Sequence, residues 1–278
     1  MLKFSIAINA VFEEYDIYDR VKLVADAGYD GIDLYRDRTG VDPIRLKEAA
    51  DSCGIQVVST ALNDTFEQTF ARPYKQIKPY WDEAFEFAKA CGAKALVGFG
   101  GVKMSPRDEP KNLIIENLKR IEPDARANGI VILLEALNNV YEHQHVYLNS
   151  SVLTFEILKC VDSPYCKMAY DTFHMQATEG NILYNLLPNL DYLGHLHCVG
   201  MPFHHEPFYS EVNHPYVLRE LEKAGYDGFV CAEYHPTYDH FRSVRDVLEY
   251  LHTCHEEPKY PNVRKDLDFS QNKPVQNG

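Results

Sequence analysis

The chain has 278 residues, of which 45% are apolar and 25% charged, and its formal net charge is −13. This composition is typical of a soluble globular protein with a sizeable core. The acidic balance argues against nucleic-acid binding, which generally depends on basic surfaces. No run approaches the roughly 18 apolar residues of a membrane span, and the seven cysteines lack a Cys-x-x-Cys pair. We therefore expect a cytoplasmic protein that binds neither nucleic acid nor a membrane.

Short apolar or β-branched runs recur along the chain, with amphipathic stretches between them. Eight such runs occupy residues 3–9, 31–35, 55–62, 95–100, 130–137, 166–171, 193–199 and 229–234. Strands that alternate with helices predict a parallel sheet, because parallel neighbours need long crossover connections. Eight strand-helix units predict an α/β fold of a single (β/α)₈ TIM barrel, for which about 250 residues is a usual length.

The alternative, an open doubly wound sheet, is disfavoured by the residues that follow the first run. Such sheets often carry a glycine-rich phosphate loop there, whereas residues 10–14 read Ala-Val-Phe-Glu-Glu. A glycine cluster at residues 98–101 predicts a tight turn at the barrel mouth. No domain boundary is visible, so we expect one catalytic barrel over residues 1–256. Residues 257–278 are polar and proline-containing, which predicts a tail that wraps the surface or frays.

Four consecutive runs close with an acidic or imidazole side chain: Glu135, Asp171, His197 and Glu233. Their separations of 36, 26 and 36 residues each correspond to about one strand-helix unit. In TIM barrels the carboxyl ends of the strands meet at one rim, where active sites lie, so these side chains should converge. His195 is the main rival to His197, and its place two residues earlier predicts that it lies inside the barrel or behind the site.

Three carboxylates brought together repel one another, and a divalent cation removes that cost by coordination. An oxygen-rich set with one imidazole favours Mn²⁺, with Mg²⁺ or Co²⁺ as alternatives, over structural Zn²⁺. Any one of these residues could instead cap a helix or pair with Lys or Arg. Four such residues at the ends of consecutive strands favour a site for one divalent metal ion.

Four segments carry a resemblance to the xylose isomerase-like TIM barrel superfamily of sugar isomerases and epimerases, particularly its hydroxypyruvate isomerase and ketose 3-epimerase branches. They read Leu-Glu-Ala-Leu-Asn at 134–138, Tyr-Asp-Thr-Phe-His at 170–174, Gly-His-Leu-His at 194–197 and Ala-Glu-Tyr-His-Pro at 232–236. The resemblance implies metal ligation by Glu135, Asp171, His197 and Glu233. It also implies that the two glutamates form the proton-transfer pair and that His174 contacts substrate.

Two loops depart from the pattern of these branches, which usually place arginines after the fifth and seventh strands. Here the loops contain His143, His145, His204 and His205 instead. The difference predicts a neutral substrate, because imidazoles replace a fixed guanidinium charge. His145 and His204 join His174 as candidate substrate-binding residues, although each loop histidine could also be solvated surface.

The interpretation that agrees best with these residues is a metal-dependent isomerase or epimerase of carbohydrate metabolism, acting on a ketose or small hydroxy-carbonyl compound through an enediolate. A related lyase that cleaves keto-sugar C-glycosides with a small partner subunit is the alternative, and a non-catalytic sugar-binding barrel is disfavoured because both glutamates are present. A homo-oligomer remains open. Several aromatic residues follow strand ends and would form either a pocket wall or core: Phe12, Tyr35, Phe66, Phe99 and Phe203.

Overall fold

The computed structural model describes residues 1–35, 38–62, 69–103 and 109–256. Eight parallel strands close into a barrel in the order β1 to β8, with β1 paired to β8. The strands are β1 Lys3–Ala7, β2 Gly31–Leu34, β3 Gln56–Ala61, β4 Ala95–Phe99, β5 Val131–Glu135, β6 Cys166–Asp171, β7 Leu193–Cys198 and β8 Phe229–Ala232. The predicted single (β/α)₈ barrel is confirmed. The expected tail and Phe66 lie outside the described residues.

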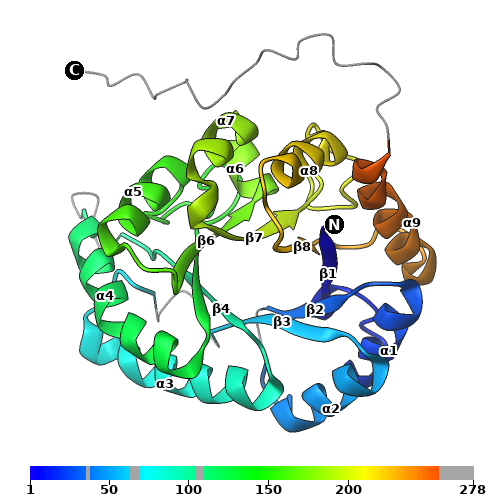
Figure 1. Cartoon of the computed structure of the whole chain (residues 1–278), viewed down its shortest axis with the longest axis horizontal. Helices are drawn as coiled ribbons and strands as arrows, with labels where there is room; N and C mark the ends of the chain where they lie inside the picture. Colours follow the sequence, from blue (N-terminus) through cyan, green and yellow to red (C-terminus); the bar gives the residue numbers. More distant parts are fainter. Residues whose placement is uncertain (36–37, 63–68, 104–108, 257–278) are drawn as a thin grey trace.

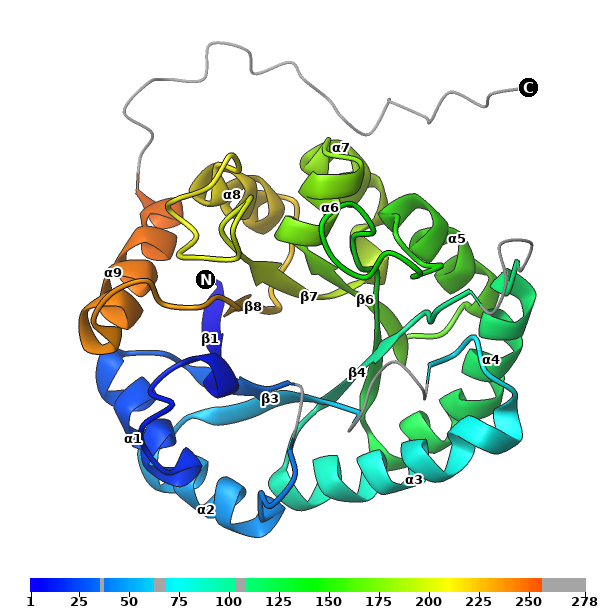
Figure 2. The same cartoon turned by 180° about the vertical axis from the view of Figure 1, so that it is seen from behind.

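Helices form a ring around the circumference of the barrel and cover the outer face of its strands (Figure 1 and, from behind, Figure 2). The α-helices are α1 Ile17–Ala27, α2 Pro43–Cys53, α3 Tyr74–Cys91, α4 Lys111–Asn128, α5 Ser151–Val161, α6 Thr172–Thr178, α7 Ile182–Leu186, α8 His214–Lys223 and α9 His240–His252. Short 3₁₀ helices are η1 Ile8–Ala10, η2 Leu187–Tyr192 and η3 Thr253–His255. Within the described ranges, none of the helices has the length and apolar character needed to cross a membrane.

The helix ends follow the signals expected from the sequence. Asp42 begins α2 by accepting hydrogen bonds from the backbone N–H groups of residues 44 and 45. Gly54 ends the same helix in the left-handed conformation, which glycine adopts without the steric cost of a Cβ. The next strand therefore starts at a defined position two residues later. Similar capping residues occur at other helix ends around the ring. They help to determine where each strand begins and where its carboxyl end lies.

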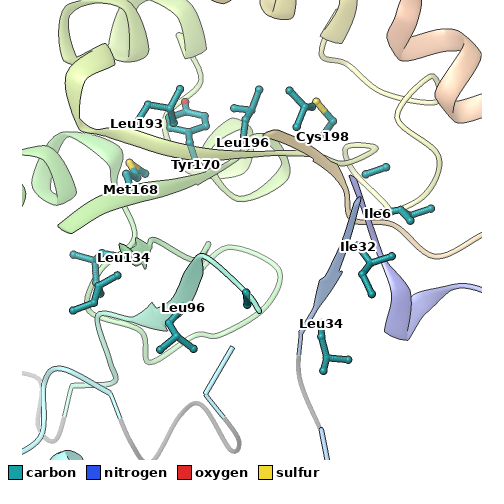
Figure 3. Packing of buried hydrophobic residues seen from close by; sticks show 14 of the residues in the cluster. Ile6, Ile32, Leu34, Leu96, Leu134, Met168, Tyr170, Leu193, Leu196 and Cys198 are labelled. Atoms are coloured by element: carbon teal, nitrogen blue, oxygen red, sulfur yellow. The ribbon is translucent and has the colours of Figure 1, made fainter. Parts of the chain in front are cut away.

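Two layers of side chains build the interior. Alternate strand residues such as Ile6, Ile32 and Leu196 pack against the helices in the main core, as Figure 3 shows. The residues between them face the bore of the barrel, where Ala7, Ala169 and Cys231 belong to a separate small cluster. Because adjacent strand residues point to opposite faces, the polar residues that lie between the outer core positions also face the bore.

The glycine cluster at residues 98–101 was expected to form a tight turn, but Gly98 and Phe99 belong to β4 and no turn is assigned at residues 100–101. Gly98 lies inside β4, and a Cβ there would stand 2.7 Å from Cζ2 of Trp81 on α3. Trp81 is fully buried and stacks at 4.8 Å on Phe70. The absent side chain therefore lets an aromatic ring of the outer helix layer pack directly on the strand backbone.

Replacing Gly98 with alanine should destabilise the fold by about 1–3 kcal/mol, the usual cost of overpacking a filled core. Denaturant unfolding followed by circular dichroism measures the change. The double variant Gly98→Ala/Trp81→Phe should show a smaller loss than the sum of the single losses, because the smaller ring vacates the contact. Strict additivity would contradict the assigned contact.

Candidate metal centre at the barrel rim

The structure brings Glu135, Asp171, His197 and Glu233 together at the carboxyl ends of β5 to β8. One ligand-type atom from each lies within 4.8 Å of the others. The His197 Nδ1 atom stands 3.5 Å from Glu135, 3.6 Å from Asp171 and 2.8 Å from Glu233. Glu135 and Asp171 end their strands, whereas Glu233 comes one residue after β8. The imidazole is thus surrounded by three carboxylates.

Two buried atoms of this group make no hydrogen bond of suitable geometry with the described residues: Oδ2 of Asp171, and Nδ1 of His197, which has only its 2.8 Å charge contact with Glu233. Buried polar atoms are nearly always partnered, so an unpartnered pair aimed at one point suits a cation placed between them. The other oxygen of Asp171 accepts hydrogen bonds from the backbone N–H groups of Phe173 and His174 and begins α6. Helix capping therefore fixes the carboxylate while leaving one oxygen directed at the site.

The charges of the group perturb one another strongly. Burial raises the pKa of Glu135 to about 7, and the charges of Glu233 and Asp171 add to the rise. The pKa of His197 is raised well above its usual value, because Glu233 and Glu135 outweigh the opposing effect of burial. Burial would also raise the pKa of Asp171 and of Glu233, but nearby histidines hold both below their ordinary values. A divalent cation would offset the cost of burying the Glu135 charge and the repulsion that Glu233 and Asp171 add to it.

His197 is held from behind by a chain of buried hydroxyl groups. Its Nε2 atom lies 3.0 Å from the hydroxyl of Tyr35, which is 3.0 Å from Oγ of Ser59. Ser59 donates in turn to Oδ1 of Asp33 at 2.6 Å. An imidazole that binds a metal through one nitrogen commonly fixes its orientation through the other. Tyr35 therefore directs Nδ1 of His197 toward the carboxylates.

His174 lies on α6 beside the group and is almost completely buried. Its Nδ1 atom accepts a hydrogen bond from the backbone N–H of Asn138 at 3.1 Å. That bond places the imidazole hydrogen of the neutral ring on Nε2. Burial lowers the pKa of His174, which favours the neutral ring. His174 can thus offer a neutral N–H donor.

His204 approaches the group from the loop after β7, and the loop is attached to the segment after β8. The backbone carbonyl of His204 accepts from the N–H of His235 at 3.0 Å. Two residues further on, the fully buried carboxylate of Glu206 accepts from the backbone and the hydroxyl of Thr237 and from Ser243. His204, Tyr35 and Glu233 line a small cavity of about 50 Å³. Sequence patterns alone did not reveal the role of Glu206.

The histidines after β5 occupy different environments. The ring of His143 is 5.8 Å from that of His174, whereas His145 is exposed and its backbone carbonyl accepts from Lys103 N–H. Proximity to the rim thus favours His143 over the predicted His145. Among the aromatic candidates, Phe12 is core, Phe99 is half-buried beside the bore and Phe203 is 71% exposed. Only Tyr35 of these reaches the four-residue group, through its hydroxyl.

His195, the predicted rival, lies deeper in the barrel and ion-pairs with Asp33 at 3.2 Å. Its place inside the barrel agrees with the prediction, whereas Asp33 and Ser59 were not predicted. A signal was present, since residues 31–34 read Gly-Ile-Asp-Leu, an aspartate within an otherwise apolar strand. A charge in a buried strand requires a partner.

Comparison with known proteins decides the family. The model of the xylose isomerase-like TIM barrel family matches residues 21–254. The chain belongs to this family. This xylose isomerase-like barrel is 26% identical over 245 residues to 2-oxo-tetronate isomerase of Pectobacterium atrosepticum, covering 85% of the chain and 93% of that protein. It is also 26% identical over 248 residues to hydroxypyruvate isomerase of Escherichia coli, covering 85% and 94%.

Solved structures share the fold at lower sequence identity. The xylose isomerase-like barrel superposes on a structure described as an AP endonuclease, family 2, from Brucella melitensis with a TM-score of 0.83. The sequences are 20% identical, and the match covers 90% of this chain and 99% of the other. At that identity the likeness concerns the fold alone.

The electrostatics predict that Mn²⁺ stabilises the protein more at about pH 8 than at about pH 5.5. Glu135 and His197 have folded-state pKa values above their unfolded values, so their contribution to stability is present at low pH and lost as pH rises through the folded values. Mn²⁺ would bind the deprotonated ligands. Its binding should therefore restore the stability that is lost as pH rises. Thermal unfolding with and without Mn²⁺ at both pH values measures the difference.

The control for this experiment is Asp171→Asn, which can keep the helix cap but loses the charge. It should abolish most of the Mn²⁺-dependent shift at both pH values. A shift in the parent protein that does not change with pH would contradict the assigned electrostatics.

Replacing Tyr35 with phenylalanine removes the hydroxyl behind His197 and should lower Mn²⁺ affinity about 10-fold or more, the usual effect of losing such a contact. Calorimetric titration measures the affinity. Tyr29→Phe is the matched control, because the buried Tyr29 hydroxyl donates to the Val244 carbonyl, away from the rim. Equal affinities in parent and Tyr35→Phe would show that the hydroxyl does not orient His197.

Proposed function

We propose that the protein is a divalent-metal-dependent isomerase or epimerase of a ketose or small hydroxy-carbonyl compound. The observation that carries the proposal is the pair of glutamates, Glu135 and Glu233, that approach one imidazole from β5 and from the end of β8. Curated relatives that match over most of the chain are isomerases. The class of reaction thus agrees with both the residues and the relatives.

Glu135, Asp171, His197 and Glu233 are the residues that would hold the metal. The donor set of three carboxylates and one imidazole suits Mn²⁺, with Mg²⁺ or Co²⁺ as alternatives. When bound, the metal would polarise a substrate carbonyl and its neighbouring hydroxyl and stabilise an enediolate. The unpartnered atoms of Asp171 and His197 support this assignment.

The two glutamates supply the proton-transfer groups. Removal of a proton by one carboxylate and its return by the other from the opposite face gives epimerisation, whereas return to the neighbouring carbon gives isomerisation. Both carboxylates lie among buried residues, so bulk water does not interfere with proton transfer between carboxylate and substrate. His174 would hold a substrate oxygen through Nε2–H, with His204 on the other side of the cavity, and His145 remains the more distant candidate.

The substrate class that the rim loops favour is neutral. Residues 138–150 after β5 and 199–213 after β7 contain no lysine or arginine. A carboxylate or phosphate on the substrate would usually require such a fixed positive charge. We therefore propose a neutral ketose or keto-sugar, which differs from the acids named in the curated relatives.

Elimination is the second candidate reaction, and the nearness of His143 and His204 to His174 favours it, because an imidazole could then act as base. Exposed aromatics on the same loops, Tyr141, Phe203 and Tyr209, offer a surface for a small partner subunit or a second copy. Cleavage of a keto-sugar C-glycoside should then depend on those histidines and on the partner.

A substrate panel tests the proposal directly. Metal-loaded protein is incubated in deuterium oxide with neutral ketoses, inososes, keto-glycosides and hydroxypyruvate, and product and label position are determined together. Label at a carbon next to the carbonyl with retained carbon skeleton is expected for a neutral ketose. Turnover of hydroxypyruvate alone would overturn the neutral-substrate proposal, and loss of a glycoside substituent would support elimination.

Changing Glu135 or Glu233 to glutamine should lower turnover by a factor on the order of 10² or more while retaining an oxygen ligand. Proton exchange between substrate and solvent measures the step. Glu142→Gln, an exposed acid on the loop after β5, is the control and should exchange at the parent rate. If both variants exchange as fast as the parent, neither glutamate is the base.

A further inference from the structure

A second group of ligand-type side chains lies deep in the bore, below the rim. Atoms of Asp33, His195 and Cys231 lie within 4.8 Å of one another, and all three residues are buried. They come from β2, β7 and β8, the strands on either side of the point where the barrel closes. Ser5 on β1 completes the set, because it is the register partner of Cys231. The group is thus built from four neighbouring strands.

The direction of these side chains follows from strand alternation. Ile6, Ile32 and Leu196 pack outward against the helices, as labelled in Figure 3. Ser5, Asp33 and His195 each adjoin one of these residues and therefore face inward. The neighbouring bore positions hold small residues, including Ala7 and Ala169. Larger side chains of the same cluster, Val97 and Leu133, lie on β4 and β5, away from the four strands that carry the polar group.

Ser5 Oγ and Asp33 Oδ2 have no hydrogen-bond partner among the described residues, and His195 Nε2 has only its 3.2 Å contact with the other oxygen of Asp33. Ser59 satisfies the other oxygen of Asp33, at 2.6 Å. Buried polar atoms are nearly always partnered, so two unpartnered atoms at one place indicate a missing partner. Burial would raise the pKa of Asp33, but His195 and nearby hydroxyls lower it to about 2, so the carboxylate is charged and suits a cation.

We propose that the bore binds one Zn²⁺ ion through Asp33, His195 and Cys231, with the Ser5 hydroxyl or a water as the fourth ligand. Zn²⁺ commonly takes four ligands of sulfur, nitrogen and oxygen in a tetrahedral arrangement. The rim group contains no sulfur and suits harder cations, so the two sites would select different metals. This inference does not depend on the proposed isomerase activity.

The sulfur must lose its proton to bind the ion. Burial and the neighbouring charges of Asp33 and Glu233 raise the pKa of the Cys231 thiol, so the metal-free group keeps that proton. Coordination would release it to solvent.

His195, one member of the group, also lines a cavity at the end of the barrel opposite the rim. The cavity has a volume of about 490 Å³ and is lined by the starts of several strands. Lys167, Lys94, Asp191 and Asp227 also line it, so its charge is mixed.

The position of the group gives the ion a structural role. A metal bound by β2, β7 and β8 would connect strands on both sides of the β1–β8 closure. Asp33 also continues through Ser59 and Tyr35 to His197. Filling the bore would therefore both strengthen the closure and fix the hydroxyl chain behind the rim imidazole.

Cobalt substitution tests the site with a signal that the rim cannot produce. Metal-free full-length chain is titrated with Co²⁺, and the thiolate-to-cobalt charge-transfer absorption in the near ultraviolet is recorded. We expect the band to appear in the parent and to saturate at one equivalent per chain in Asp171→Asn, where the rim site is disabled. Absence of the band in the parent would overturn the proposal.

Two variants establish which sulfur is involved. Cys231→Ser should abolish the band, whereas Cys166→Ser, a buried cysteine of β6 in the outer core, should keep it. Survival of the band in Cys231→Ser would overturn the assignment. If Cys231→Ser fails to fold, X-ray absorption of the zinc-loaded Asp171→Asn protein decides: one sulfur at about 2.3 Å from zinc supports the site, and a shell of only nitrogen and oxygen refutes it.

Discussion

Repulsion among three carboxylates that share one buried imidazole is the constraint on which the rim depends. Charges interact strongly where water is largely excluded, so a small displacement of any member would change the energy of all four. The group is accordingly held by rigid elements: Glu135 and Asp171 end strands, and Asp171 is also fixed as the cap of α6. The barrel supplies what a flexible loop could not, namely positions that resist the mutual repulsion.

The interior of the barrel is unusually polar along one line. From His197 a chain of contacts descends through Tyr35 and Ser59 to Asp33 and His195. Polar networks in a core stabilise when every member is satisfied and cost free energy when some are not. The upper part of this network is satisfied by hydroxyls, whereas the lower part retains unpartnered atoms. The barrel interior thus contains hydroxyl groups that hold the rim imidazole in place. Below them it contains a second polar group with unpartnered atoms.

The sequence allowed the barrel and the convergence of the rim residues to be predicted, because both follow from regular spacing. Apolar runs mark strands, and residues that end neighbouring parallel strands must meet. The first run, however, extends to residue 9, whereas β1 ends at Ala7 because Ile8–Ala10 forms a 3₁₀ turn. Local hydrogen bonding, which periodicity does not encode, decides such boundaries.

The contacts made by loop residues were harder to predict, because they also depend on local hydrogen bonding that periodicity does not encode. His143 and His145 are equivalent in sequence, and only the folded loop brings His143 near His174 and exposes His145. Tyr35 looked like an apolar wall residue, but its hydroxyl contacts His197. Glu206 gave no signal, because its partners Thr237 and Ser243 lie more than thirty residues away.

The buried carboxylate of Glu206 has a consequence for how substrate recognition can change. It ties the loop after β7 to the segment after β8, so the two form a single mechanical unit above the rim. Replacing only the segment after β8 with one that lacks the Thr237 and Ser243 donors would leave the buried Glu206 carboxylate unpaired, at a cost of several kcal/mol. Evolution and protein engineering alike must therefore exchange these two segments together, whereas the loop after β5 is free of this particular tether.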